Sequence, residues 1–360
     1  MSPTSQPQKL PAHLTAMVAG ATGAVAKRLI EVLAGDPRWN VIGLSRNPPV
    51  VSGRMRHAPV DLLDPVDCRR RIEPFGGVTH LFYCARAKHG EGGTESVEEN
   101  VAMLRNVLDA VEAAAPLQHV HLLEGLKWYG VHLGPYPTPA QEDDPRHMPP
   151  NFYYDQEDLL RERQRGKAWS WSASRPNVIC DFAPERARNL SSTLGAYAAI
   201  VAELGMPLDF PGKPATFTAL TELTDATLLA RGLVHMATSD ACRNEAFNIT
   251  NGDIVRWSRL WQRVANFYGL KVGTVRTLRL GEWMRDKDAI WEKVVARHRL
   301  QRCRLDQLAH WGFADFVLAQ AYDVVSRTTK LRRAGFHEIL DTEEMVIDHL
   351  ARYREARLLP

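Results

Sequence analysis

The stretch LTAMVAGATGAVAKRLIEVL, residues 14–33, combines an apolar run, a glycine-rich turn and a helical pattern. Residues 14–18 predict a strand, and the spacing of apolar residues over 29–33 predicts a helix. A strand, a tight turn and a helix in this order are typical of a dinucleotide-binding loop. In the pattern G-x-x-G-x-x-A, Gly20 permits the tight turn and Gly23 lets the backbone approach a pyrophosphate. The amides at the following helix N-terminus favour phosphate.

The end of the second predicted strand indicates which dinucleotide is bound. This strand, residues 41–45, is followed by Arg46, and no acidic residue stands there to bind a ribose diol. Arg46 could clamp a 2′-phosphate, which favours NADPH, and a solvent-exposed arginine without a ligand is the alternative. Asp61 and Leu62 end the next short strand, where an adenine edge would lie, although Asp61 could equally cap a loop.

Strand and helix patterns alternate through the first half of the chain. Further strands are predicted over 57–60, 78–85, 119–123 and 169–180, and helices over 97–111 and 151–161. This alternation is typical of an α/β fold with a doubly wound, Rossmann-type parallel sheet.

The pattern becomes rich in helices after about residue 183, with Trp257, Leu260, Trp261 and Val264 on one helical face. We therefore expect three parts. These are a loose tail over 1–13, an NADP-binding Rossmann domain over 14–182, and a smaller, mostly helical substrate-binding part over 183–360 with some segments returning to the Rossmann core.

The composition excludes several other classes of protein. The 360 residues are 45% apolar and 24% charged, which is an ordinary globular balance. The net charge of +3 is too small and scattered to indicate a nucleic-acid partner. No apolar segment is long enough to span a membrane. Five cysteines, odd in number and far apart, argue against a zinc site or a disulfide framework, so no metal and a cytoplasmic location are expected.

The usual catalytic pair of Rossmann reductases, a tyrosine and a lysine, is not found at its usual spacing in this sequence. These enzymes use Tyr-x-x-x-Lys on one helix face, but no tyrosine here has a lysine four residues on. Lys127, just after the fifth strand, lies at the sheet edge where catalytic groups of this fold gather. The lysine could therefore come from a different element.

The segment Asn151–Asp158, NFYYDQED, resembles the NFYYxxED motif of the progesterone 5β-reductase/iridoid synthase-like family, whose members are atypical extended short-chain dehydrogenases. Other segments resemble the motifs of this family in the same order. They are VTHLFY (78–83), NVAMLRNVLD (100–109), WSWSASRPNVI (169–179), NEAFN (244–248) and NGD (251–253). The resemblance therefore extends over most of the chain.

The resemblance implies NADPH-dependent reduction of the activated C=C bond of enones or enals. It places the catalytic pair on Tyr154, the second tyrosine of the motif, and Lys127. Hydride would reach the β-carbon while Tyr154 stabilises the enolate oxygen, supported by the Lys127 ammonium. The implied cofactor contacts are Gly20, Thr22, Gly23, Ala24, Val25, Ser45, Arg46, Asp61, Leu62, Cys84, Ala85, Tyr154, Pro176 and Ile179.

The chain also departs from the motifs of this family. A second basic residue after the second strand is replaced by Asn47, and V-T-W after the central strand is replaced by CAR, residues 84–86. The residues before Gly125 are Leu123-Glu124 instead of Gln-Thr. The loop from Lys127 to Tyr154 is about five residues shorter than in plant members. Because this loop covers the pocket, the substrate is the property that the resemblance to the family predicts least well.

Aromatic residues near the site are expected to line an apolar pocket, although some of such a set must belong to the core. They are Trp128, Phe152, Tyr153, Phe182 and Tyr197. Glu157 and Asp158 are expected on the helix surface or as capping groups, and not as an acid/base dyad.

Two other functions stay open at this point. The same tyrosine and lysine could support reduction of a ketone or aldehyde, or an epimerase-like reaction. The altered positions around residues 84–86 and 123–124 would instead suit a regulatory protein that binds NADPH without turnover. The expected partner is a small apolar enone or carbonyl compound, with a homodimer expected only by analogy.

Overall fold

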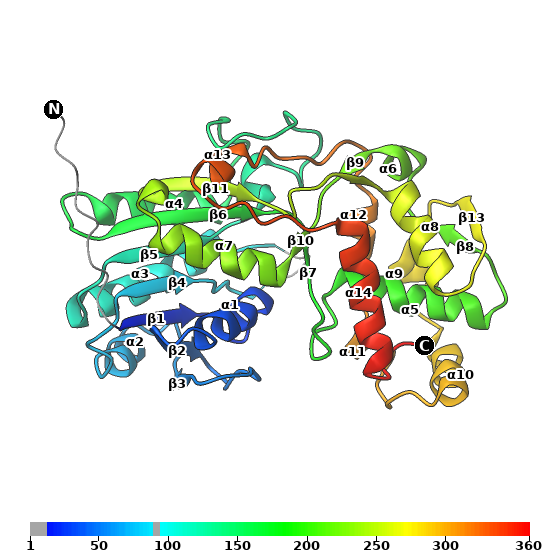
Figure 1. Cartoon of the computed structure of the whole chain (residues 1–360), viewed down its shortest axis with the longest axis horizontal. Coiled ribbons are helices and arrows are strands. Elements are labelled where there is room, and N and C mark those ends of the chain that lie inside the picture. The colour runs from blue at the N-terminus through cyan, green and yellow to red at the C-terminus, as the bar shows by residue number, and fades with distance from the viewer. Residues whose placement is uncertain (1–12, 89–93) are drawn as a thin grey trace.

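The computed structural model describes residues 13–88 and 94–360, so the predicted tail falls outside it except for His13. A seven-stranded sheet in the order β11-β6-β5-β4-β1-β2-β3 forms the left half of the molecule (Figure 1). All of its neighbouring strands are parallel. The strands are β1 (Leu14–Ala19), β2 (Trp39–Ser45), β3 (Arg56–Pro59), β4 (His80–Tyr83), β5 (His119–Leu123), β6 (Ser170–Pro176) and β11 (Glu245–Ile249). The α/β, Rossmann-type fold predicted from the sequence is thus confirmed.

Helices cover both faces of this sheet. On one face lie α1 (Ala24–Ala34) and α7 (Ala226–Thr238), and on the other lie α2 (Pro65–Ile72), α3 (Val97–Ala114) and α4 (Phe152–Gln164). The β4 residues His80, Leu81, Phe82 and Tyr83 are all buried, because the strand is covered on both sides. Strand order reverses between β1 and β4, so the two halves of the sheet diverge there and leave a crevice.

The strand predicted over residues 169–180 is divided in the structure. It ends as β6 at Pro176, which has no amide hydrogen to continue a ladder, and β7 (Ile179–Cys180) pairs instead with β10 (Thr224–Asp225). The chain therefore leaves the main sheet at Pro176 and enters the second half of the molecule.

A second, mostly helical part packs around its own apolar core (Figure 1). The residues predicted for one face of α8 (Trp257–Phe267), namely Trp257, Leu260, Trp261 and Val264, are all buried in it. The remaining helices here are α5 (Leu190–Glu203), α6 (Pro214–Thr218), α9 (Leu280–Trp283), α10 (Asp288–His298), α11 (Leu305–Leu308), α12 (Trp311–Leu318) and α14 (Thr342–Glu355). Short strands accompany them, namely β8 (Leu208–Phe210), β9 (Leu220–Thr221), β12 (Val255–Arg256) and β13 (Val272–Val275). We call this part the cap.

Parts of the second half of the chain belong to the sheet and not to the cap. Strand β11 pairs with β6, α7 packs on α1, and α13 (Thr329–Arg333) lies beside β11. Among the described residues, turns of 3₁₀-helix include η2 (Leu126–Tyr129) and η3 (Asp240–Cys242).

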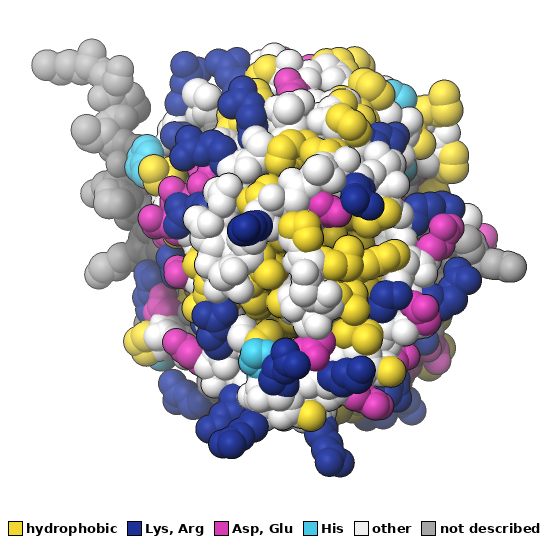
Figure 2. Space-filling view, turned by 90° about the vertical axis from the view of Figure 1, so that its right-hand side faces the viewer, with side chains coloured by type: hydrophobic (Ala, Val, Ile, Leu, Met, Phe, Trp, Pro, Cys, Tyr) yellow, Lys and Arg dark blue, Asp and Glu magenta, His cyan; other side chains and the backbone are white. Residues whose placement is uncertain are grey.

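The outer face of the cap is partly apolar. Figure 2 shows hydrophobic side chains gathered across the middle of this face, with Lys and Arg around them. Leu204 and Met206, just after α5, are among the exposed apolar side chains of the cap. Among the described residues, no helix has both the length and the apolar character needed to cross a membrane.

Candidate active site

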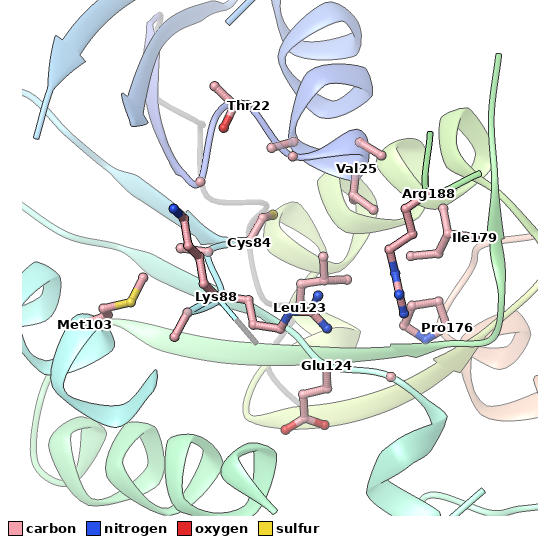
Figure 3. Close-up of a pocket in the computed structure, with 18 of the residues that line it drawn as sticks. Thr22, Val25, Cys84, Lys88, Met103, Leu123, Glu124, Pro176, Ile179 and Arg188 are labelled. Carbon is pink, nitrogen blue, oxygen red and sulfur yellow. The ribbon is translucent and has the colours of Figure 1, made fainter. Parts of the chain in front are cut away.

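The candidate site is a cavity of about 880 Å³ at the carboxyl edge of the sheet, where β1 and β4 adjoin. Its size lies within the range of small-molecule sites, roughly 300–1,000 Å³. Every residue predicted to hold the cofactor lines this cavity except Tyr154. They are Gly20, Thr22, Gly23, Ala24, Val25, Ser45, Arg46, Asp61, Leu62, Cys84, Ala85, Pro176 and Ile179. In Figure 3, Thr22 lies on one side of the cavity, and Leu123 and Pro176 lie on the other.

The glycine-rich loop between β1 and α1 is built for close backbone approach. Gly20 has φ of +80°, and a Cβ added there would lie 2.7 Å from the Ala85 Cα atom. Gly23 is the N-cap of α1 and makes no side-chain cap hydrogen bond. The first amides of α1 have no acceptor within the helix, so they are available to an anionic group in the cavity.

At the end of β2, Ser45 and Arg46 form one wall of the cavity. The Ser45 hydroxyl donates to the Asn47 carbonyl oxygen at 2.7 Å, which fixes the turn from which the exposed Arg46 projects. At the end of the neighbouring strand β3, Asp61 both lines the cavity and accepts a hydrogen bond from the Leu63 amide at 3.1 Å. Asp61 therefore also stabilises a turn, which was the alternative considered for it.

Lys127 and Tyr153 come to this cavity from two different elements. Lys127 lies in η2, directly after β5, and Tyr153 is the second residue of α4. Asn151 joins the two elements, since its side-chain amide donates to the Lys127 carbonyl oxygen at 2.8 Å and its side-chain oxygen accepts from the Tyr153 amide at 3.2 Å. The first residue of the NFYY motif thus positions both of these residues.

The Tyr153 hydroxyl reaches into the cavity beside Gly125. A Cβ added at Gly125 would lie 3.4 Å from the Tyr153 Oη atom, so the absence of a side chain there makes room for the phenol. Burial raises the pKa of Tyr153, and the nearby negative charge of Glu95 raises it further. The phenol therefore stays protonated and is able to donate a hydrogen bond.

Tyr154, which was predicted to act on the substrate, is placed differently. Its hydroxyl donates to the Trp128 carbonyl oxygen at 2.5 Å and accepts from the His147 amide at 2.9 Å. The side chain is buried between η2 and the following loop and does not line the cavity. The structure therefore brings Lys127 together with Tyr153 and not with Tyr154.

Four of the five aromatic residues expected in the substrate pocket are also placed elsewhere. Only Tyr153 lines the cavity. Phe152 is buried against Tyr153, and Trp128 packs on the Arg175 guanidinium, whose Cζ lies 3.7 Å from the ring centroid. Phe182 makes an edge-on ring contact with Tyr353. Tyr197 is buried in the cap, and its hydroxyl donates a hydrogen bond to the Asp209 carbonyl oxygen. These four side chains therefore do not line this cavity, since aromatic residues serve equally well as core.

A buried ion-pair cluster that the sequence pattern did not predict lies next to the site. Arg175, on β6, pairs with Glu124 and Glu157, each at 2.8 Å, and all three side chains are almost fully buried. Glu157 also accepts from the Trp128 indole nitrogen at 3.1 Å, so it is not the surface group that was expected. Figure 3 shows the Glu124 carboxylate directed away from the cavity. The cluster holds β5, β6, η2 and α4 in a fixed arrangement.

The fold and this cavity define a Rossmann protein of the short-chain dehydrogenase/reductase type. Residues 59–360 match the model of the family described as PRISE-like Rossmann-fold domain. The chain belongs to this family, which confirms the resemblance seen in its motifs.

Individual relatives agree with this assignment. The chain is 34% identical to 3-oxo-Delta(4,5)-steroid 5-beta-reductase of Arabidopsis thaliana, covering 96% of this chain and 93% of that one. It is 32% identical to an (S)-8-oxocitronellyl enol synthase of Nepeta cataria with the same coverage.

Solved structures share the fold at low identity. A short-chain dehydrogenase/reductase superfamily protein from Agrobacterium tumefaciens with bound NAD superposes with a TM-score of 0.67 at 16% identity, over 96% of this chain and 98% of that one. RMD from Pseudomonas aeruginosa, complexed with NADPH, has a TM-score of 0.66 at 14% identity, again over 96% and 98%.

Proposed function

We propose that the protein is an NADPH-dependent reductase of the activated C=C bond of α,β-unsaturated carbonyl compounds. The observation that supports it most directly is that Lys127 and Tyr153 line the same cavity as the glycine-rich loop and Arg46. The named activity of the Arabidopsis relative, a steroid 5-beta-reductase, is consistent with this chemistry. The solved structures with NAD and NADPH are consistent with a nicotinamide cofactor.

The residues of the cavity fit NADPH. Gly20 and Gly23 give the pyrophosphate a close approach to the backbone, and the first amides of α1 complement its charge. Arg46, at the end of β2, is suited to the 2′-phosphate, since a guanidinium binds phosphate in a bidentate manner. When bound, NADPH supplies the hydride for the β-carbon.

Tyr153 is the residue that we assign to the carbonyl oxygen of the substrate, in place of Tyr154. Negative charge builds on this oxygen during conjugate reduction, and a hydroxyl donor aimed at it lowers the barrier. Lys127 lines the same cavity, and we assign its ammonium, which also pairs with Glu95 at 2.9 Å, to strengthen this donor. Tyr153 keeps its proton throughout, because the enolate takes its proton at the α-carbon from water.

A pair of neighbouring variants tests this assignment. Tyr153→Phe removes the donor and is expected to lower kcat for enone reduction by about 100-fold, as for other single oxyanion donors. Tyr154→Phe removes only two backbone contacts and is expected to lower unfolding stability by about 1 kcal/mol with a far smaller loss of kcat. The kcat values of both tyrosine variants, and of Lys127→Ala alongside, are measured from NADPH oxidation with cyclic and linear enones. The larger loss of kcat in Tyr154→Phe would contradict the assignment.

The same assay distinguishes the proposed enone reductase from the two other functions considered for this protein. Turnover of saturated ketones or aldehydes in the same assay would favour a carbonyl reductase. NADPH binding without turnover of any acceptor would favour a regulatory protein.

A further variant tests the cofactor assignment. Arg46→Ala is expected to lower the preference for NADPH over NADH by about 10-fold, because it removes a charge-assisted contact to the 2′-phosphate. An unchanged preference would contradict the proposed role of Arg46.

A further inference from the structure

Four cationic side chains from two segments far apart in the sequence line the cavity. Arg86 and Lys88 follow β4, whereas Arg186 and Arg188 lie in the loop between β7 and α5, and all four line the cavity. Arg86 and Arg188 both keep part of their surface accessible to solvent. The lining of the cavity therefore carries several positive charges.

Within the part of the chain that the structure describes, carboxylates pair with only some of these cations. Glu95 accepts from Arg86 at 3.1 Å and from Lys127 at 2.9 Å, so one carboxylate is shared by two cations. Within residues 13–88 and 94–360, Arg188 has no carboxylate partner. Its Cζ lies 4.5 Å from the centroid of the Phe313 ring.

The positive charges also disfavour one another. Burial lowers the pKa of Arg188, and the charges of Arg86 and Arg186 lower it further, against the opposing effect of Glu95. An arginine remains protonated even so. A bound anion would relieve this repulsion, so the arrangement favours a negatively charged ligand.

Of the two arginines in the loop between β7 and α5, only Arg186 lies where it would contact the proposed cofactor. Arg186 donates to the Thr22 carbonyl oxygen at 2.7 Å, which places it beside the glycine-rich loop and the proposed pyrophosphate. Arg188 lies instead against Phe313 of α12, and α12 also contributes Phe316 to the cavity. Figure 3 shows the Arg188 side chain directed into the cavity, on the same side as Pro176 and Ile179 and away from Thr22. Arg188 thus faces the part where the reacting compound would lie.

We infer that the substrate carries a carboxylate in addition to its conjugated carbonyl group, and that Arg188 binds this carboxylate with Arg86 beside it. The planar guanidinium pairs with a carboxylate through two parallel hydrogen bonds. Phe313 and Phe316 provide an apolar wall for the carbon chain between the two groups. This inference rests on the function proposed above and adds a charged group to the small apolar enone or carbonyl compound expected from the sequence.

Matched acids and esters test the inference. The probes are (E)-6-oxohept-4-enoic acid and (E)-8-oxonon-6-enoic acid, each compared with its methyl ester. We expect kcat/KM to be at least about 10-fold higher for at least one acid than for its ester. Arg188→Met should bring this ratio close to one, and Arg188→Lys, which keeps the charge, should restore part of it. Equal values for both acid and ester pairs in the wild type would overturn the inference.

Two variants identify what Arg188 does. Arg302→Met removes an exposed arginine outside the cavity and should keep the wild-type ratio. Arg186→Met should raise the Kd for NADPH. If Arg188→Met raised that Kd equally and kept the acid preference, Arg188 would be a cofactor ligand and the inference would fail.

A binding measurement separates this inference from the proposed reaction. Titration calorimetry of 6-oxoheptanoic acid and its methyl ester into the NADP⁺-loaded protein requires no turnover. Selective binding of the acid that is lost in Arg188→Met supports the carboxylate site, even if no enone is reduced. Equal binding of acid and ester would overturn it, even if neutral enones are reduced.

Discussion

At the scale of single residues, Gly20 shows how the backbone makes room for the nucleotide. Its positive φ and its close approach to Ala85 leave no space for a side chain. We expect Gly20→Ala to raise the Kd for NADPH by at least about 10-fold, because the loop must move away from the phosphates. Fluorescence titration with NADPH measures this. Gly77→Ala is the control, since a Cβ there has no atom within 4 Å, and an equal effect in both variants would contradict the explanation.

The two tyrosines of the NFYY motif show a limit of residue-level prediction. Successive residues of a helix point about 100° apart, so only one of two neighbours can face a given cavity. The spacing of the motif does not say which one, and the resemblance suggested Tyr154. The contacts to Trp128 and His147 decide it, because they hold the Tyr154 hydroxyl away from the cavity.

At the scale of elements, the site depends on how α4 is joined to η2. Asn151 caps α4 and also holds the Lys127 carbonyl, so Asn151→Ala should lower the unfolding free energy by about 1 kcal/mol and also lower kcat. Asp64→Ala removes the comparable cap of α2 and should cost similar stability while leaving kcat at the wild-type value. Urea unfolding and steady-state kinetics of both variants check this. Equal kcat in the two would show that Asn151 acts only as a cap.

At the scale of the whole molecule, Glu222 connects segments that are distant in the sequence. Its carboxylate accepts from the Ser326 hydroxyl at 2.6 Å and from the Thr250 hydroxyl at 3.5 Å, and its backbone oxygen accepts from Asn177 at 2.7 Å. Burial raises the pKa of Glu222 to about 7. Unlike Arg175 and its carboxylate partners, this carboxyl is held by neutral groups.

The raised pKa predicts how stability changes with pH. The unfolded chain releases the Glu222 proton near pH 4.5, whereas the folded protein holds it to about pH 7. The contribution of Glu222 to the free energy of unfolding is therefore fully present below pH 4.5. It is lost as the pH rises to 7, by about 3 kcal/mol in total. In urea unfolding at pH 5 and pH 8, Glu222→Gln should lose this part of the pH dependence. The exposed Glu162→Gln is the control, and identical profiles for the two variants would refute the prediction.

Features that depend on near neighbours in the chain could be predicted from the sequence. The glycine-rich turn, the alternation of strands and helices, the buried face of α8 and the family motifs were all readable, because each follows from residues close together in the chain. The sequence also predicted that residues following the parallel strands lie in one site, since the carboxyl ends of these strands meet at one edge of the sheet.

Which side chains face the cavity depends on long-range packing and could not be predicted from the sequence. The selection of Tyr153, the burial of Glu157 with Arg175, and the approach of Arg188 to Arg86 depend on contacts between segments far apart in the sequence. An aromatic or charged residue has the same local pattern in a core, on a surface or in a pocket. Its surroundings are set by the packing of the sheet, α4 and the cap, and no short stretch of the chain contains that information.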